Sequence, residues 1–222
     1  MTLSWATHRG LVRRDFIAAT FIGAVAGLSL PVAQAAPAPT VLVVGDSLSA
    51  EYGLKRGTGW VALLQKQLAT EKINATVVNA SISGDTTSGG RARLAALLQH
   101  NKPTHVVIEL GGNDALRGLP LPMTEDNLQQ MVKAAKDQGA KVLLLGMQVP
   151  PNYGSDYTQR FAKLYTSVAK AHQVPLVPFF LKGVADAPNA LSLFQADRIH
   201  PREEAQPALL ANVWPELKKL LK

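Results

Sequence analysis

Short apolar runs alternate with longer amphipathic stretches along most of this chain, from about residue 40 to its end. Five of the runs are rich in Val, Leu or Ile, and they cover residues 41–44, 75–79, 105–110, 141–145 and 175–179. Continuous apolar runs, without a polar residue at every second position, are typical of parallel strands buried on both faces. The pattern therefore predicts a five-stranded parallel sheet.

The stretches between the runs show helical periodicity. Apolar residues recur three or four positions apart around residues 61–68, 94–98, 124–139, 157–168 and 202–221. Thr124 is expected to be the N-cap of the third of these helices, which would end at Gly139. Alternation of strands and helices, with no repeat or linker, predicts one α/β domain of three layers with right-handed crossovers.

The N-terminal part of the chain follows a different pattern. Three arginines precede an apolar run at 16–30, and the sequence Pro-Val-Ala-Gln-Ala then ends at Ala35. A basic segment, a short apolar segment and a small-x-small site are the parts of a secretory signal peptide. We therefore expect residues 1–35 to be removed and residues 36–222 to form an exported, periplasmic domain. Paired arginines also fit a twin-arginine export route, and an uncleaved anchor is the alternative.

Composition narrows the classes of site and partner. The 222-residue chain contains no Cys, which excludes a disulfide-stapled fold, a Cys-ligated metal centre and a cysteine nucleophile. Loss of the signal peptide would lower the formal net charge from +7 to +5, because it removes three arginines and Asp15. The remaining basic residues are scattered, so no nucleic-acid partner is expected. Transient contact with anionic lipid surfaces is compatible with this charge.

Polar, glycine-rich segments follow the first three predicted strands, at residues 45–49, 83–86 and 111–114. Ligands bind beyond the carboxyl ends of the strands in such sheets, so these segments should meet at one edge. Ser47, in the first segment, offers either a nucleophilic hydroxyl or a helix N-cap. Gly84 and Asn113, in the other two, offer either hydrogen-bond donors for an oxyanion or simple turn residues.

A serine nucleophile needs a base, and His200 is the best candidate among the five histidines. The other four lie in the expected signal peptide, at predicted helix ends or at the start of a strand. Only His200 follows a carboxylate, Asp197, by three residues, so that the acid can orient the imidazole and stabilise its charged form. The pattern around Ser47 is not the Gly-x-Ser-x-Gly elbow of the α/β-hydrolases.

Together these segments resemble the SGNH (GDSL) hydrolase superfamily in order and spacing. The resemblance rests on Gly-Asp-Ser-Leu at 45–48, Gly84, Gly-Gly-Asn-Asp at 111–114 and Asp-x-x-His at 197–200, and it extends over the whole expected mature chain. Within that superfamily, the sequence is similar to the bacterial periplasmic thioesterase I/protease I group, which includes lysophospholipases and arylesterases.

The resemblance implies a flavodoxin-like α/β/α sandwich and a serine mechanism. It implies Ser47 as the nucleophile, His200 as the base and Asp197 as the acid that orients it. The N–H groups of Ser47 and Gly84 and the side chain of Asn113 would be the oxyanion donors. No cofactor or metal is implied, although Asp85, Asp114, Asp197 and His200 carry groups that can ligate a metal.

The expected function is that of a secreted serine esterase, which would form an acyl-enzyme from aryl esters, acyl thioesters or lysophospholipids. A carbohydrate O-deacetylase on the same fold and a non-catalytic periplasmic acyl-chain binder are the alternatives. Two apolar loops supply candidate substrate-binding residues: Leu116 and Leu119 after the third strand, and Pro151 and Tyr153 after the fourth. These side chains could equally pack on the core. A monomer is expected.

One further motif is rejected. Residues 57–62 match the Gly-x-Gly-x-x-Ala fingerprint of dinucleotide-binding proteins. They begin well after the first predicted strand and not in its own turn, so the geometry that places a pyrophosphate is missing. We expect these glycines to form the loop that enters the first helix.

Overall fold

The computed structural model describes residues 38–222, apart from the side chain of Pro151. Five strands form one parallel sheet in the order β2-β1-β3-β4-β5, with bounds β1 Thr40–Gly45, β2 Thr76–Asn79, β3 His105–Glu109, β4 Lys141–Leu145 and β5 Leu176–Val177. This order is the flavodoxin-like one. The predicted fold class is therefore confirmed.

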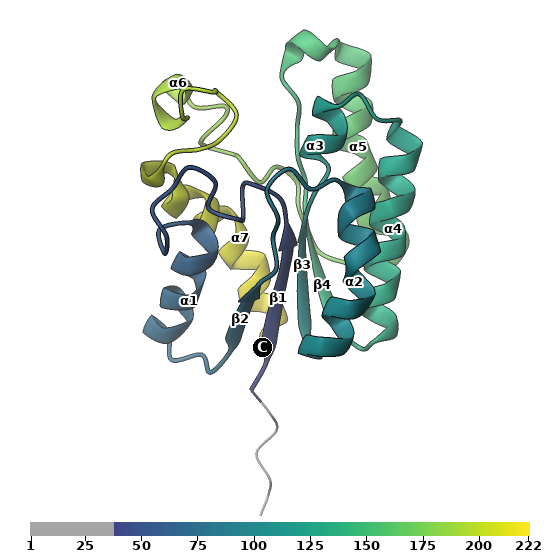
Figure 1. The fold of residues 1–222 in the computed structure, drawn as a ribbon, viewed down its shortest axis with the longest axis vertical. Helices are drawn as coiled ribbons and strands as arrows, with labels where there is room; N and C mark the ends of the chain where they lie inside the picture. The colour runs from purple at the N-terminus through teal and green to yellow at the C-terminus, as the bar shows by residue number, and fades with distance from the viewer. Residues whose placement is uncertain (1–37) are drawn as a thin grey trace, which may run out of the picture. The chain divides into compact units, whose positions relative to one another are not determined.

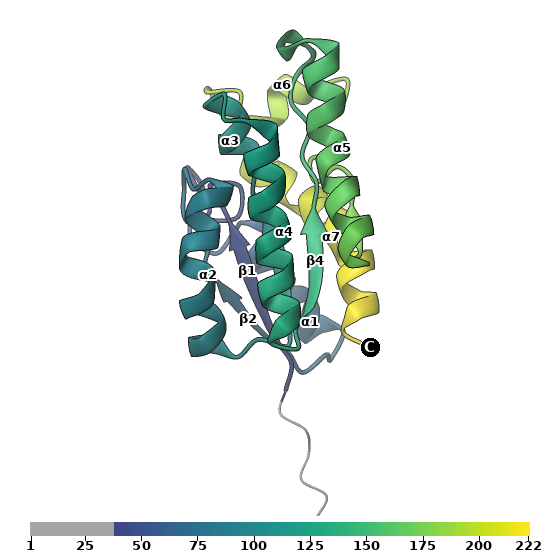
Figure 2. The ribbon, with the colours of Figure 1, turned by 90° about the vertical axis from the view of Figure 1, so that its right-hand side faces the viewer.

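Helices cover both faces of the sheet (Figures 1 and 2). One face carries α1 (Trp60–Thr70) and α7 (Gln206–Leu220), which pack on each other. The other face carries α2 (Thr87–Asn101), α4 (Leu121–Asp137) and α5 (Ser155–His172). Shorter elements lie at the carboxyl ends of the strands: α3 (Gly112–Leu116), η1 (Pro151–Tyr153), α6 (Ala190–Leu193) and η2 (Glu203–Ala205).

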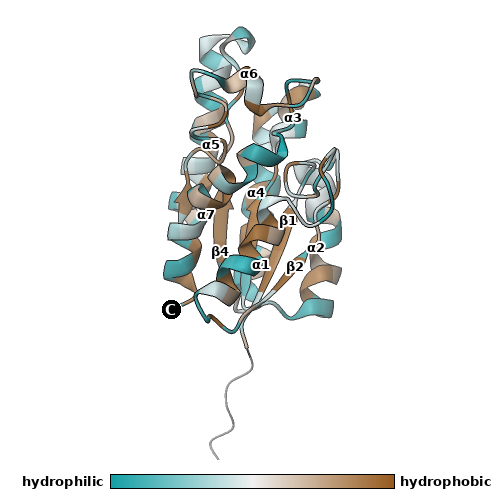
Figure 3. Cartoon of the chain, turned by 90° about the vertical axis from the view of Figure 1, so that its left-hand side faces the viewer, coloured by the Kyte–Doolittle hydropathy of each residue, from teal (hydrophilic) through white to brown (hydrophobic). Residues whose placement is uncertain are grey.

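The core lies in the central strands and the helix stripes that cover them. Leu42 of β1, Val106 of β3 and Leu143 of β4 are fully buried, as the continuous apolar runs predict. Each such side chain contributes about 1.5–3 kcal/mol of transfer free energy to folding. Figure 3 shows the hydrophobic strands behind the mixed surfaces of α1 and α7.

The helix α4 begins earlier than predicted. The helix expected to begin at Thr124 begins at Leu121, because Pro122 fits the first turn, where no backbone N–H is needed. Thr124 is not a cap. It is buried, and its hydroxyl donates to the carboxylate of Asp114 at 3.2 Å.

The last strand and the last helix are shorter than predicted. The last strand has only two residues, and the last helix begins at Gln206, after the turn η2.

The Gly57–Gly59 segment leads into α1, as predicted, and Gly59 is the N-cap of that helix. The carboxylate of Glu51 holds this segment by accepting the N–H groups of Gly57 and Gly59 at 3.0 and 2.8 Å.

Two predictions concern the chain's relation to membranes. The predicted signal peptide at residues 1–35 and its cleavage site lie outside the described residues. The alternative of an uncleaved anchor concerns the same segment and is likewise not described. Among the described helices, none is both long and apolar enough to cross a bilayer.

Candidate active site

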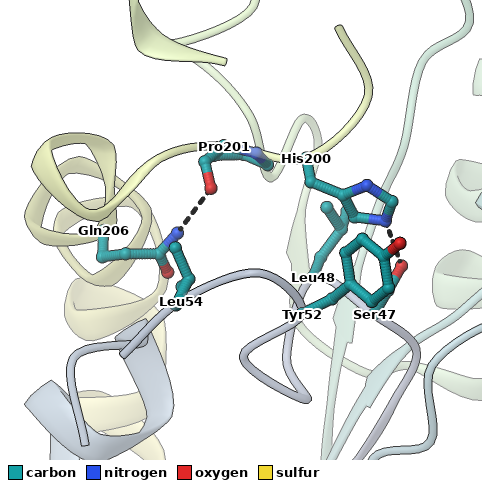
Figure 4. A pocket seen from close by; sticks show the side chains of 7 residues that line it. All are labelled: Ser47, Leu48, Tyr52, Leu54, His200, Pro201 and Gln206. Atoms are coloured by element: carbon teal, nitrogen blue, oxygen red, sulfur yellow. Dashed lines mark hydrogen bonds between the residues drawn. The ribbon is translucent and has the colours of Figure 1, made fainter. Parts of the chain in front are cut away.

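The nucleophile candidate follows directly from β1. Asp46, 2% exposed, closes a turn: its backbone carbonyl accepts the N–H of Ala50 at 2.9 Å and its carboxylate accepts the N–H of Leu48 at 3.0 Å. Asp46, and not Ser47, therefore caps this turn. The hydroxyl of Ser47 is left to point out of the turn, toward the segment between α6 and α7 (Figure 4).

Three residues form a continuous hydrogen-bonded chain at this point. The Nε2 atom of His200 lies 2.8 Å from the Oγ atom of Ser47, and its Nδ1 atom lies 2.7 Å from the Oδ2 atom of Asp197. Figure 4 shows the first of these contacts. A carboxylate at Nδ1 favours the tautomer with the proton on Nδ1, which leaves Nε2 free to accept a proton from the serine. The arrangement suits general-base activation of a hydroxyl.

Asp197 is held as a charged carboxylate. Partial burial raises its pKa, but the N–H of Ile199 at 2.9 Å, the imidazole and the N–H of His200 at 3.1 Å outweigh that effect. The net result is a pKa of about 2. A carboxylate with this pKa stays ionised at any pH at which an esterase would be assayed.

The loop that carries His200 is fixed mostly by its own backbone. Phe194 and Pro201 form an isolated β-bridge, and the N–H of Gln195 donates to the carbonyl of His200 at 2.8 Å. Arg198, between the acid and the base, has a φ of 59°, which closes the loop sharply. The ring of Tyr52 lies 4.3 Å from the imidazole of His200. Nothing in the sequence pattern had indicated this last contact.

The backbone N–H groups of Ser47 and Gly84 are the first two candidate oxyanion donors. Among the described residues, neither Ser47 nor Gly84 donates its N–H to a protein acceptor. Gly84 has a φ of 78°, a conformation that favours glycine, and its carbonyl accepts the guanidinium of Arg117 at 2.7 Å. Because the N–H of Gly84 has no protein acceptor among the described residues, it is available to a ligand.

Asn113 lies in the first turn of α3, close to the same edge. Its Nδ2 atom donates to Oδ2 of Asp46 and to the carbonyl of Asp85, each at 3.0 Å. The chain reaches this position through Gly111, whose φ is 118° and where a Cβ atom would lie 2.1 Å from the hydroxyl of Tyr165. Ser47, Gly84 and Asn113 therefore come from three strand ends to one edge of the sheet, as their spacing predicts.

The other acidic candidates make structural contacts. Asp85 forms an ion pair with Arg93 at 2.8 Å, and Asp114 is fully buried and accepts the N–H of Thr87 at 2.8 Å. Within residues 38–222, no group of three or more His, Asp or Glu side chains is arranged to hold a metal ion.

Glu109, the last residue of β3, is a site residue that the sequence analysis did not identify. It is fully buried and accepts the hydroxyl of Ser49 at 2.8 Å and the N–H of Asp46 at 3.3 Å. The available signal was a single carboxylate directly after the apolar residues Val106, Val107 and Ile108 of this strand.

Apolar side chains surround the site. The exposed large apolar residues among those described all come from segments at the carboxyl ends of the strands: Tyr52, Ile82, Leu116, Met123, Tyr153, Leu191 and Ile199. Of the four substrate-binding candidates, Leu116 and Tyr153 are 50% and 36% exposed, and Leu119 is half-buried. Pro151 belongs to η1, but its side chain lies outside the described part of the structure.

Comparison with known proteins places the chain in a family. The sequence model of the GDSL-like Lipase/Acylhydrolase family matches residues 43–207. Esterase TesA of Pseudomonas aeruginosa is 57% identical over 188 residues, which cover 85% of this chain and 92% of that protein. Thioesterase 1/protease 1/lysophospholipase L1 of Escherichia coli K12 is 42% identical over 188 residues, covering 85% and 88%. A crystal structure of TesA matches with a TM-score of 0.78 and 57% identity, covering 82% of this chain and 99% of that chain.

Proposed function

Because the chain belongs to the GDSL-like lipase/acylhydrolase family, we propose that it cleaves carboxylic esters and thioesters through a covalent acyl-enzyme on Ser47. Hydrolysis of esters is the activity of the family. The serine mechanism is our proposal, and one observation carries it: the unbroken chain of contacts from Ser47 through His200 to Asp197. A binding protein has no need of a base within 2.8 Å of a serine hydroxyl.

The proposed reaction has two halves. Oγ of Ser47 attacks the carbonyl carbon of the substrate while Nε2 of His200 takes its proton. The tetrahedral intermediate then collapses, the carbon–oxygen or carbon–sulfur bond to the leaving group breaks, and His200 gives its proton to the departing alcohol or thiol. Water, which gives a proton to the same imidazole, attacks the acyl-serine; the bond between the acyl carbon and Oγ of Ser47 breaks, the carboxylic acid leaves, and His200 returns the proton to Oγ. Asp197 stabilises the imidazolium that forms twice in this cycle.

The developing oxyanion would lie against the N–H groups of Ser47 and Gly84. Both lack a protein acceptor among the described residues, which supports this assignment. Asn113 would be the third donor. Both hydrogens of its amide already point to protein acceptors, Asp46 and Asp85, so one of them must be shared with the oxyanion. Such a contact strengthens as negative charge develops, which is the condition for transition-state stabilisation.

The substrate class follows from the apolar rim. We propose that Leu116, Leu119, Pro151 and Tyr153 contact the acyl chain or aromatic ring of aryl esters, acyl thioesters or lysophospholipids. The exposure of Leu116 and Tyr153 supports this. Leu116 ends α3, which lies across the carboxyl edge of the sheet from α6 (Figure 1). Exposed basic residues stand among these apolar ones, Arg117 and Arg198 included, so transient contact with an anionic lipid surface is part of the proposal.

A fluorophosphonate probe tests the mechanism directly. The proposed enzyme should be labelled once, at Ser47, and Ser47→Ala should not be labelled. An acyl-chain binder would remain unlabelled, and that result would overturn the proposal. Hydrolysis rates for aryl acetates, long-chain acyl thioesters, lysophospholipids and acetylated xylo-oligosaccharides would then separate the esterase from an O-deacetylase.

We also propose that the protein is exported and acts as a periplasmic monomer after cleavage near Ala35. N-terminal sequencing of the protein from its native host should give a terminus at Ala36 or within two residues of it. An intact terminus in the membrane fraction would favour the anchor instead.

A further inference from the structure

Two carboxyl groups lie together behind the nucleophile. β1 and β3 are paired with Gly45 opposite Glu109, so the strands end side by side and bring Asp46 next to Glu109. Both residues are buried, at 2% and 0% exposure. Gly45 provides the space, because a Cβ atom there would lie 2.8 Å from Oε2 of Glu109. No described Lys or Arg forms an ion pair with either carboxyl.

The hydrogen bonds of the two carboxyl groups differ, and the difference indicates which of them can hold a proton. Asp46 accepts on both oxygens, from the N–H of Leu48 and from Nδ2 of Asn113, each at 3.0 Å. Glu109 accepts on Oε2 only, whereas Oε1 is buried and has no partner among the described residues. Asp46 is therefore bonded as a carboxylate, and Oε1 of Glu109 is the one carboxyl oxygen free to be protonated.

A second contact fixes Oε2 as an acceptor. The hydroxyl of Ser49 accepts the indole N–H of Trp60 at 3.1 Å, so its own proton goes to Oε2 of Glu109 at 2.8 Å. Trp60 is fully buried at the start of α1. The acid at the end of β3 is thereby tied to the nucleophile turn and to the helix that follows it.

Electrostatics favour the same assignment. Burial raises the pKa of both groups, that of Asp46 to about 6 and that of Glu109 well above its usual range, and the charge of Asp46 raises the latter further. The nearby titratable or charged groups on the surrounding elements are Arg93 of α2, Asp114 of α3, Tyr165 of α5 and His200. Arg93 is engaged by Asp85 and by backbone carbonyls, so it does not neutralise the pair.

We propose that Glu109 is a positioning residue, which stays protonated at neutral pH and thereby keeps Asp46 a carboxylate that holds Asn113 and the Ser47 turn in catalytic geometry. The inference rests on the proposed function, since it gives the pair a role only if Ser47 and Asn113 act as assigned. Glu109 touches no reacting atom and acts through Asp46.

Paired variants of Glu109 test the inference. Glu109→Gln keeps an acceptor for Ser49 and, like the protonated acid, carries no charge beside Asp46, so it should restore most of the kcat that Glu109→Ala loses. Glu109→Ala should lower kcat by about 10²-fold, the scale of a misplacement of about 1 Å, with little change in KM. If both variants are equally slow, or if Glu109→Ala has the kcat of the wild type, the inference is wrong.

Infrared spectroscopy provides a readout that does not depend on activity or on the folding of the alanine variant. The difference spectrum of the wild type minus Glu109→Gln at neutral pH should contain the carbonyl band of a protonated carboxylic acid. Absence of the band would overturn the inference even if both variants lose activity. Turnover by Ser47→Ala, measured alongside, reports separately on the proposed function: a fully active Ser47→Ala would refute the nucleophile whatever the spectrum shows.

Discussion

Ser47 and His200 meet at 2.8 Å, but they come from two regions that are held in different ways. The turn after β1 is buried and is bonded to residues far away in the sequence, Glu109 and Asn113 among them. The loop from Phe194 to Pro201 is bonded mostly to itself, and the side chain of Asp197 is 36% exposed.

This difference separates catalytic from structural effects. A polar side chain bonded in a buried network costs stability when it is removed, because its partners stay buried and lose their hydrogen bonds. When the partner is exposed, a water molecule can replace the lost hydrogen bond, and little stability is lost. We therefore expect substitutions in the Asp197 loop to change catalysis alone, and most substitutions around Asp46 to change catalysis and stability together.

Ser47→Ala should have the largest effect and is the exception within the buried region. Its hydroxyl is bonded only to His200 among the described residues, so the melting temperature should hardly change. The kcat for an aryl ester should fall by about 10⁶-fold, the scale found for a serine nucleophile elsewhere. Steady-state kinetics and thermal unfolding of the same preparation check both parts. Turnover near the wild-type rate would refute the assignment.

Asp197→Asn should come next. The amide would favour the wrong imidazole tautomer and lower kcat by about 10⁴-fold, as in the serine-protease precedent. Its stability should fall only slightly, because the amide oxygen can still accept the N–H groups of Ile199 and His200 and the side chain is partly exposed. Asp156→Asn, which alters an exposed ion pair with Arg160 on α5, is a matched control that should leave kcat unchanged. A loss below about tenfold in Asp197→Asn would mean that another group orients the base.

Asn113→Ala should lower kcat by about 10²–10³-fold with little change in KM. It should also lower stability, because the buried carboxylate of Asp46 loses a donor. Asn212→Ala is the matched control: its amide also makes two hydrogen bonds, to the carbonyls of Phe180 and Lys182, but away from the site. The control should lose stability only. If Asn113→Ala behaves like it, Asn113 is not an oxyanion donor.

The same contrast explains what the sequence could predict. The sheet and the edge where Ser47, Gly84 and Asn113 meet follow from local patterns, since each strand and each polar segment is contiguous. Asp197 and His200 are three residues apart, so their pairing could be predicted as well. The role of Glu109 could not be predicted, because its partners Asp46 and Ser49 are about sixty residues away and meet it only through the register of β1 with β3. The bond of Thr124 to Asp114 spans only ten residues, but it depends on how α3 and α4 lie against each other, which no local pattern reveals.

The smallest effect concerns the stability of the buried region as pH rises. The pKa of Glu109 is raised in the folded protein, so above its unfolded pKa the native state binds a proton that the unfolded chain has lost. The free energy of unfolding must then fall as pH rises, by about 1.4 kcal/mol for each pH unit over which that one-proton difference persists. The decrease ends where folded Glu109 itself ionises.

A range of about pH 7.5–9 isolates this contribution. Asp46, with a pKa of about 6, is already ionised there in both states, and the lowered pKa of His105 affects stability only at lower pH. Tyr165, whose pKa is raised, contributes only at higher pH. Urea unfolding should therefore show the stability of the wild type falling from about pH 7.5 up to the pH at which folded Glu109 ionises, and Glu109→Gln, which cannot titrate, should show a flatter profile. Parallel profiles would mean that Glu109 is ionised in the folded protein, and the buried region would then tolerate two uncompensated charges.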